Sequence, residues 1–291
     1  ESGSGKSVTA MSLMGLLPNQ GESLHASRMD FASQSLIPFD KKQFQALRGK
    51  QMGMVFQDPM SALNPSMSCG KQVLEMLDLH SSHPKKNHQA TMLSLLDRVK
   101  LPDSKFIANR YPHQLSGGQQ QRVLIAIAIA CNPKLLIADE PTTALDPEVQ
   151  EEIMALLKSI QSQNKMSIVL ISHDLNLVQH WADRVLVLNK GACEEMGTAK
   201  QLFQRPQSPY TKGLINAVPP VYRRPNRLQT VQDFINGSPK PTNETITGRK
   251  KRHKRIYQQS PILEVKGLEK TFRQGKQSHH ALHKINFSIY P

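Results

Sequence analysis

The sequence contains few cysteines and no long hydrophobic run. Its longest apolar stretch, VLIAIAIAC at 123–131, falls short of the roughly 18–20 residues that cross a bilayer and suits a buried helix instead. The three cysteines, Cys69, Cys131 and Cys193, are odd in number and far apart, which excludes a disulfide framework and a paired-cysteine metal site. A reducing compartment is the simpler interpretation. No signal-peptide pattern is found, and the first residue is not methionine.

Acidic residues are fewer than basic ones: the sequence has 23 Asp and Glu against 37 Lys and Arg, which gives a formal net charge of +14. An excess of this size suggests nucleic acid or anionic lipid as a partner. However, residues 222–255 alone carry ten Lys and Arg against two acids, a net charge of +8. Because this stretch includes Pro225, Pro239 and Pro241, it predicts a linker. For its run RKKRHKR (249–255), a solvated linker is favoured over contact with lipid or nucleic acid.

Residues 1 to about 220 predict one α/β unit. Apolar residues recur at helical spacing over 7–17 and from about 70 to 108. Continuous apolar strands that alternate with helices indicate a parallel sheet covered on both faces. The strand-like runs are QMGMVF (51–56), KLLIADE (134–140), SIVLISH (167–173) and RVLVLNKG (184–191).

The chain opens with ESGSGKS (1–7), which is the pattern G-x-x-x-x-G-K-S/T without its first glycine. The backbone N–H groups of such a loop point from a helix N-terminus at the phosphates of a nucleotide. Lys6 would add a positive charge there, and the Ser7 hydroxyl would be a ligand for Mg²⁺. A flexible turn before a helix is the alternative for this loop taken alone.

Two carboxylates, Asp139 and Glu140, end the apolar run LLIADE. A carboxylate at the carboxyl end of a strand suits a Mg²⁺ site, and the adjacent one can polarise an attacking water. An acidic surface turn before Pro141 is the alternative. The phosphate loop upstream favours the functional interpretation.

The most specific stretch is LSGGQQQR at 115–122. Ser116 and the pair Gly117 and Gly118 stand where a helix begins, an arrangement that can make a second anion site. One chain rarely needs two separate sites for a γ-phosphate. A head-to-tail dimer does, because each nucleotide then lies between one partner's loop and the other partner's Ser-Gly-Gly.

Together these motifs resemble the nucleotide-binding domain of ABC ATPases, over roughly residues 1–220 and again at 262–291. They follow the family's order, from the phosphate loop through the Q-loop glutamine, the LSGGQ signature, the Walker B run LLIADE and the D-loop ALD to the switch histidine. The resemblance implies an α/β fold of the P-loop NTPase (RecA-like) type. Its parallel sheet would carry an inserted α-helical subdomain at about 58–115 and β-strands of an antiparallel subdomain.

The resemblance also implies a role for each motif residue. Glu140 would be the general base, His173 would contact the γ-phosphate, and Gln57 would sense Mg²⁺, water and the membrane partner. The Mg²⁺ ligands would come from Ser7, Gln57 and Asp139. The residues implied for ATP binding are Ser2, Gly3, Ser4, Gly5, Lys6, Ser7, Ser116, Gly117, Gly118, Gln119, Asp146 and Phe272.

Two further stretches, MVFQDPMSALNP (54–65) and LFQRPQSPYTKGLINAVP (202–219), resemble the oligopeptide, dipeptide and nickel group of ABC importers. The cysteine cluster that ends many separate subunits of that group does not follow Pro219. Instead, a linker at 221–260 leads into ILEVKGLEKTFRQG, which resembles the opening of another nucleotide-binding domain. The chain is therefore expected to be a fragment of a fused, two-domain member, with residues 261–291 as the first strands of its second domain.

On this interpretation the first domain, residues 1–220, lacks its leading strands and its first loop glycine. The runs ILEVKGLEKTF (262–272) and HALHKINFSIYP (280–291) resemble the missing strands, so we expect them to fold back onto the first domain's sheet. Phe272 stands where the family places the aromatic that stacks on adenine, and it would then approach the phosphate loop.

The expected function is an ATP-binding and ATP-hydrolysing subunit that energises an ABC importer for peptides or related small solutes. It would lie at the cytoplasmic face of the inner or plasma membrane. Its expected partners are transmembrane permease subunits, a second ABC domain and, indirectly, a solute-binding protein, with no nucleic acid. The alternatives are a soluble tandem ABC ATPase acting on the ribosome or nucleic acid, and an inactive fragment. The irregular, proline-containing linker weighs against the soluble alternative.

Overall fold

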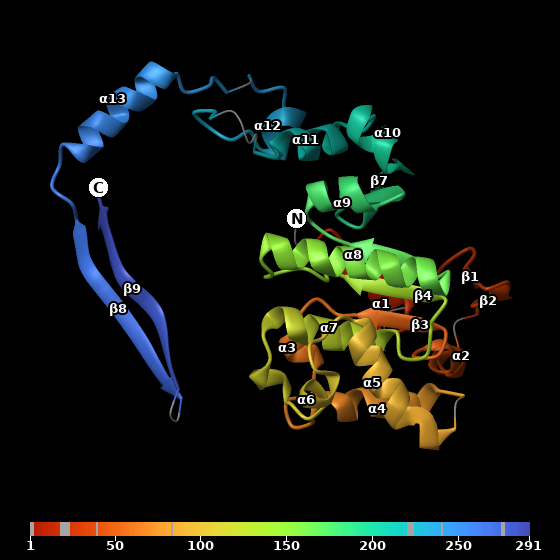
Figure 1. The fold of residues 1–291 in the computed structure, drawn as a ribbon. Coiled ribbons are helices and arrows are strands. Elements are labelled where there is room, and N and C mark those ends of the chain that lie inside the picture. The colour runs from red at the N-terminus through yellow and green to blue at the C-terminus, as the bar shows by residue number, and fades with distance from the viewer. Residues whose placement is uncertain are drawn as a thin grey trace. The chain divides into compact units, whose positions relative to one another are not determined.

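The computed structural model divides the chain into two units (Figure 1), Glu1–Thr211 and Lys212–Pro291. In the described residues, no helix is both long and apolar enough to cross a bilayer. The described residues are 3–17, 24–38, 40–82, 84–219, 224–239, 241–274 and 277–291.

Three of the predicted apolar runs form one parallel sheet in the first unit. Its strands are β3 (Met52–Val55), β4 (Leu135–Asp139) and β5 (Ser167–Ile171), in the order β3-β4-β5. The register pairs Val55 with Ala138 and Asp139 with Ile171. Because the strands are parallel, their carboxyl ends lie at one edge of the sheet, where α/β proteins bind ligands.

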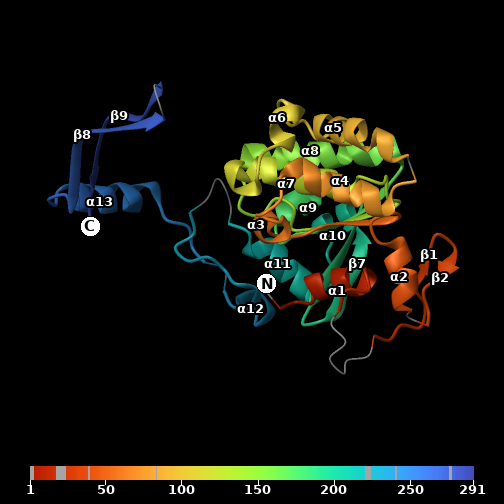
Figure 2. The same cartoon turned by 90° about the horizontal axis from the view of Figure 1, so that it is seen from below.

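Both faces of this sheet are covered, as the continuous apolar strands predict. On β4, Ile137 packs in a cluster with Ala10 of α1 (Lys6–Leu13). Its neighbours Leu136 and Ala138 belong to the opposite cluster, together with buried residues of α7 (Gly117–Ala128) and α8 (Pro147–Asn164). This alternation follows the two-residue period of a strand. Figure 2 shows α1 on the side of the unit opposite α7 and α8. The predicted α/β fold class is confirmed.

Between β3 and β4, the segment at about 58–115 that was expected to be helical is helical. The buried side chains include Val73, Leu77, Met92 and Leu96, which follow the spacing of three and four residues that predicted helices there. The helices are α3 (Pro59–Ala62), α4 (Cys69–His80), η1 (Lys85–Asn87), α5 (His88–Arg98), α6 (Ser104–Ala108) and η2 (Pro112–Gln114).

The run RVLVLNKG forms β6 (Arg184–Asn189), but β6 does not pair in the parallel sheet. It pairs antiparallel with β7 (Ala192–Thr198), so the expected place of this run in the parallel sheet is wrong. The reason is a tight turn, since Lys190 and Gly191 have positive φ values of 49° and 81°. Two such residues favour a two-residue hairpin, which returns the chain directly. The remaining elements of this unit are β1 (Asp30–Phe31), β2 (Gln34–Ser35), α2 (Lys41–Leu47), α9 (Leu175–Trp181) and α10 (Ala199–Gln204).

Helix α11 (Pro209–Ala217) crosses the boundary between the units, and the second unit continues with α12 (Val231–Ile235) and α13 (Ile246–Tyr257). The expected irregular linker is therefore wrong for these two helical segments.

The two strand-like runs near the end of the chain form β8 (Leu263–Gln274) and β9 (Gln277–Ile289), as predicted. β8 pairs antiparallel with β9 in a sheet of two strands. The expected fold-back of these strands onto the first sheet stays a prediction.

Helix α7 lies directly against β3 at Gly53. A Cβ atom placed on Gly53 would stand 2.3 Å from the carbonyl oxygen of Ala128, which is backbone and cannot rotate away. We therefore expect Gly53→Ala to lower the free energy of unfolding by about 1–3 kcal/mol or more, the usual range for overpacking a core. Urea denaturation of the purified chain measures this loss. The matched control is Gly117→Ala, whose added Cβ would meet only Leu145 at 3.5 Å. Equal stability of the two variants would contradict this packing argument.

Candidate functional site

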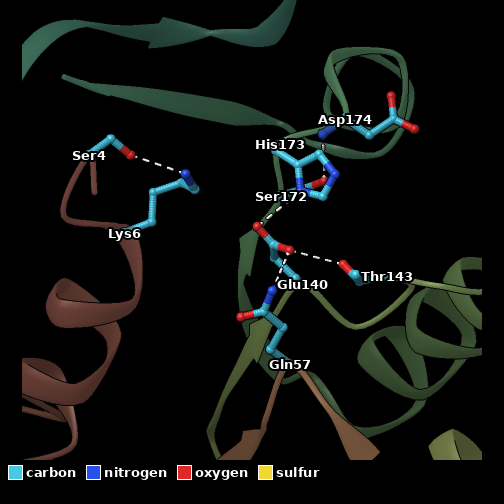
Figure 3. A network of polar contacts seen from close by, with 8 residues as sticks. All are labelled: Ser4, Lys6, Gln57, Glu140, Thr143, Ser172, His173 and Asp174. Carbon is cyan, nitrogen blue, oxygen red and sulfur yellow. Dashed lines mark hydrogen bonds and ion pairs between the residues drawn. The ribbon is translucent and has the colours of Figure 1, made fainter. Parts of the chain in front are cut away.

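The carboxyl ends of the three parallel strands bring together the polar residues of three motifs (Figure 3). Gln57 follows β3, Glu140 follows β4, and His173 follows β5. The backbone N–H of Glu140 donates to the carbonyl oxygen of Ile171 at 2.9 Å, which continues the ladder between β4 and β5. Glu140 has a positive φ of 47°, an uncommon conformation for a non-glycine residue. Such backbone strain is concentrated at functional sites.

Three side chains contact the carboxylate of Glu140. His173 Nδ1 lies 2.9 Å from Oε1. Gln57 Nε2 and the Thr143 hydroxyl both donate to Oε2, each at 2.9 Å. The side chain of Glu140 is 12% exposed and that of His173 is 60% exposed, so the histidine ring forms the solvent side of the group. This arrangement holds the carboxylate in one orientation at the edge of the sheet.

Glu140 has a pKa below its ordinary value. Burial alone would raise the pKa, but hydrogen bonds from His173 and Thr143 outweigh it, and the charges of His173 and Lys6 act in the same direction as those bonds. The carboxylate is therefore held in its ionised form, which is the form that can accept a proton.

The neighbouring carboxyl group, Asp139, lies in a different environment. Its side chain is buried, and its Oδ1 has no hydrogen-bond partner among the described residues. Burial raises the pKa of Asp139, and the nearby charge of Glu140 adds to this, whereas a hydrogen bond from Ser7 and the charge of Lys6 oppose it. A buried carboxylate oxygen without a partner is costly unless a cation binds it. Together with the Ser7 hydroxyl, it fits the oxygen ligands that Mg²⁺ prefers.

The predicted phosphate loop turns into α1 through two glycines with positive φ, Gly3 at 82° and Gly5 at 97°. Gly5 is the N-cap of α1, and no side chain of the described residues caps this end. The first N–H groups of a helix without a cap can bind an anion. Lys6 Nζ donates to Ser4 Oγ at 3.0 Å, and Ser4 is buried. Ser2, the other predicted loop residue, lies outside the described residues.

Sequence reasoning missed two residues that support these groups. One is Thr143, whose hydroxyl contacts Glu140. The other is Gly191 in the turn between β6 and β7, whose N–H donates to the carbonyl oxygen of Ser4 at 3.1 Å. A Cβ on Gly5 would stand 3.4 Å from the Gly191 Cα, so the loop and the turn lie close together. The positive φ of Gly191 belongs to a hairpin turn, and nothing in the sequence indicated its contact with the loop.

The signature segment starts α7, as predicted. Ser116 is the N-cap, and its Oγ accepts from the Gln119 N–H at 3.3 Å while Gln119 Oε1 accepts from the Ser116 N–H at 3.1 Å. This reciprocal pair is a capping box. Gly118 also serves packing, since a Cβ there would stand 2.8 Å from Val149 of α8. Among the described residues, Ser116 and Gln119 bond to each other and not to Glu140 or the side chains that contact it. A role in ATP binding stays a prediction for Ser116, Gly117, Gly118 and Gln119.

Two predicted residues stand apart from this group. Asp146 is the N-cap residue of α8, but its carboxylate accepts no capping hydrogen bond from the described residues. Phe272 lies on β8 of the second unit, where its side chain is exposed and Lys270 Nζ stands 5.3 Å from the ring centroid. Their roles in nucleotide binding also stay predictions.

Comparisons with known proteins agree with these observations. The family model "ABC transporter" matches residues 1–143, and the model "Oligopeptide/dipeptide transporter, C-terminal region" matches residues 195–252. The dipeptide transport ATP-binding protein DppD of Haemophilus influenzae is 45% identical over 237 residues, which are 81% of this chain and 72% of that protein. The glutathione import ATP-binding protein GsiA of Escherichia coli is 37% identical over 310 residues, covering 100% of this chain and 48% of that protein. The chain thus spans about half the length of GsiA.

A solved structure supports the same assignment. It is an ATP-binding cassette in a dimeric, post-hydrolysis state bound to ADP and Pi, with a TM-score of 0.59 and 30% identity, covering 68% of this chain and 82% of that chain. The parallel sheet, the loop before α1 and the paired carboxylates define the chain as a P-loop NTPase of the α/β class. With relatives of this identity and coverage, the chain belongs to the family of ABC transporter ATP-binding proteins, and the resemblance seen in the sequence is confirmed.

The contact from Thr143 gives a prediction about proton affinity. Thr143→Val removes one of the hydrogen bonds that lower the pKa of Glu140, so that pKa is expected to rise. Carboxyl ¹³C NMR titration measures it, with the Glu140 resonance assigned by its loss in Glu140→Gln. Thr143→Ser keeps the hydroxyl and is expected to keep the wild-type value. An unchanged pKa in Thr143→Val would mean that the hydroxyl does not act on Glu140.

Proposed function

We propose that this chain is part of an ATP-hydrolysing subunit that powers the import of peptides or related small solutes through an ABC transporter. The observation that carries the proposal is the convergence of Gln57, Thr143 and His173 on Glu140, next to the buried carboxylate of Asp139. An ionised, oriented carboxylate beside a cation site is what hydrolysis of a phosphoanhydride by water requires.

In this proposal Glu140 is the general base that orients the attacking water and accepts its proton. Its lowered pKa keeps it ionised, and contacts on both carboxylate oxygens fix its direction. His173, bonded through Nδ1 to Glu140, presents its exposed ring to the γ-phosphate. Gln57 links the strand end of β3 to the same carboxylate, so a movement of the segment after β3 would disturb the base. This is how Gln57 would sense water, metal and the membrane partner.

The loop residues Gly3, Ser4, Gly5, Lys6 and Ser7, with Ser2 before them, would hold the phosphates of ATP. The open N-terminus of α1 supplies N–H donors, and Lys6 supplies positive charge. Mg²⁺, when bound, would neutralise charge on the phosphate oxygens, and its protein ligands would be Ser7, Asp139 and Gln57.

Residues 1–220 would form a first ABC domain, 221–260 a basic linker and 261–291 the opening strands of a second ABC domain. The match of the whole chain to 48% of GsiA supports this division. Ser116, Gly117, Gly118 and Gln119, with Asp146, would face a nucleotide bound by a second ABC domain in a head-to-tail sandwich. The dimeric cassette bound to ADP and Pi is a precedent for pairing of cassettes. Phe272 would stack on adenine.

The proposed partners are transmembrane permease subunits, with a solute-binding protein acting indirectly, at the cytoplasmic face of the membrane. The match of residues 195–252 to the C-terminal region of oligopeptide and dipeptide transporters supports a peptide-like solute. The names of DppD and GsiA, a dipeptide and a glutathione import protein, point the same way. The basic helix α13 removes the irregular linker as a ground against a soluble role on ribosomes or nucleic acid, and the match of residues 195–252 is what favours the importer.

The role of Glu140 is tested by Glu140→Gln, which keeps the size of the side chain and removes the base. We expect ATP hydrolysis to fall by about 10²–10⁴-fold, the usual contribution of a general base. ATP binding should stay within about twofold of wild type, because the variant removes no phosphate ligand. Phosphate release and nucleotide titration measure the two effects. Glu148→Gln, at the exposed start of α8, is the matched control. Wild-type hydrolysis by Glu140→Gln would remove Glu140 from the mechanism.

The role of Asp139 is tested by Asp139→Asn. If its buried oxygen binds Mg²⁺, the variant should lose the strengthening of ATP binding that Mg²⁺ produces, by about tenfold or more. In EDTA the variant and the wild type should bind ATP equally. Fluorescent nucleotide titration with and without Mg²⁺ separates the two cases. A Mg²⁺ effect of wild-type size in the variant would show that Asp139 is not a ligand.

A further inference from the structure

The basic run RKKRHKR (249–255) does not form the irregular linker expected of it, and the proposed ATPase site does not use it. It lies on α13 (Ile246–Tyr257), where Thr245 caps the start of the helix by accepting from the Gly248 N–H at 3.1 Å. Twelve residues of helix are about 18 Å long, so six cations lie on a short rod. All six are exposed: Arg249, Lys250, Lys251, Arg252, Lys254 and Arg255.

Five of these six cations are distributed over one broad side of the helix. At 100° per residue, the positions 250, 254, 251, 255 and 252 follow one another around about 200° of the helix circumference. The opposite side carries Ile246, His253, Ile256 and Tyr257 together with the sixth cation. A helix of this kind presents a continuous positive surface to a flat, negatively charged partner.

Acidic side chains near α13 neutralise only a small part of this charge. Glu244 pairs with Arg252 through two bonds, to Arg252 Nε at 3.0 Å and Nη2 at 3.1 Å. Asp233 pairs with Arg227 at 2.9 Å, outside α13. In the described part of the chain, five cations of the helix form no ion pair: Arg249, Lys250, Lys251, Lys254 and Arg255.

Apolar and aromatic groups mark both ends of the helix. Ile246 at its start is exposed, and Tyr257 at its end is exposed as well. Tyr257 contacts Tyr290 of the second unit edge-on, with ring centroids 5.0 Å apart. Tyrosine with one side packed and one side exposed is typical of residues at the level of lipid headgroups.

We propose that α13 binds the anionic headgroups of a membrane surface. Clusters of four to eight Lys and Arg on a helix beside a membrane have the charge that binds anionic lipid, and α13 carries six. Low apolar content keeps such a helix on the surface and out of the hydrocarbon. The inference rests on the proposed function in one respect: an importer subunit works at the cytoplasmic face, where anionic lipids lie.

Nucleic acid is less suited to this helix. Its residues include no Asn or Gln, the side chains that read adenine edges in the major groove. Its Lys and Arg can contact phosphates, and guanine is the base whose edge they can read. Headgroups on a membrane need no such reading, because they form a continuous layer of charge.

The test uses the purified chain and co-sedimentation with lipid vesicles. The chain should bind vesicles of which one third is phosphatidylglycerol and should not bind vesicles of phosphatidylcholine alone. Binding should weaken as salt rises, because screening acts strongly on exposed charges. ATP binding is measured on the same preparation, so a failure of the ATPase proposal is seen separately from a failure to bind lipid.

Two matched variants locate the surface. The first removes the five unpaired cations with a residue of similar helix propensity: R249Q, K250Q, K251Q, K254Q and R255Q. At roughly fivefold in affinity per basic residue, this variant should bind anionic vesicles at least about 100-fold more weakly. The second removes five exposed lysines of the first unit and should stay within about twofold of wild type: K41Q, K42Q, K85Q, K86Q and K105Q.

A third variant changes binding in the opposite direction, so misfolding cannot imitate it. Glu244→Gln removes the acid that pairs with Arg252 and should strengthen vesicle binding by about fivefold. The proposal is overturned if the chain ignores anionic vesicles, if the two five-residue variants lose equal affinity, or if Glu244→Gln does not strengthen binding. It is also overturned if an RNA duplex binds α13 more tightly than the vesicles do at the same salt, since nucleic acid would then be the partner.

Discussion

The register of the three parallel strands determines the geometry of the candidate site. Because Val55 pairs with Ala138 and Asp139 with Ile171, the chain leaves all three strands at the same level. The side chains after β3, β4 and β5 therefore meet around one carboxylate. A slip of one residue in β4 would exchange the faces of its side chains and move Ile137 out of its cluster with α1. The apolar packing on the two faces thus fixes the polar geometry at the edge.

Adjacent carboxyl groups at this edge differ because their surroundings differ. Asp139 ends β4 and is buried, which raises its pKa, whereas Glu140 stands one residue later and accepts hydrogen bonds that lower its pKa. Pairs of acids whose surroundings separate their proton affinities commonly divide two tasks. In the proposed mechanism Asp139 binds the cation and Glu140 accepts the proton.

Much of the fold and of the site could be predicted from the sequence, because buried strands are apolar and the motif residues follow them directly. Asp139 and Glu140 were found in this way, whereas Gln57 and His173 were assigned through the resemblance to the order of motifs in the family. The pairing of β6 was not, because an apolar run does not say whether its neighbour is parallel or antiparallel. The helix at α13 was missed because charge and nearby prolines suggested a linker. The hydroxyl of Thr143 was missed because its contact depends on the turn after β4, which a local pattern does not specify.

The close contact between α7 and the backbone of β3 at Gly53 also has a mechanical consequence. Because α7 rests on the backbone of β3 without a side chain between them, a shift of the helix toward the strand would bring backbone atoms into overlap. Ser116 stands at the start of α7, and Gln57 stands four positions beyond Gly53. A tilt of α7 at its Ser116 end would therefore press on the backbone of β3, four residues before Gln57.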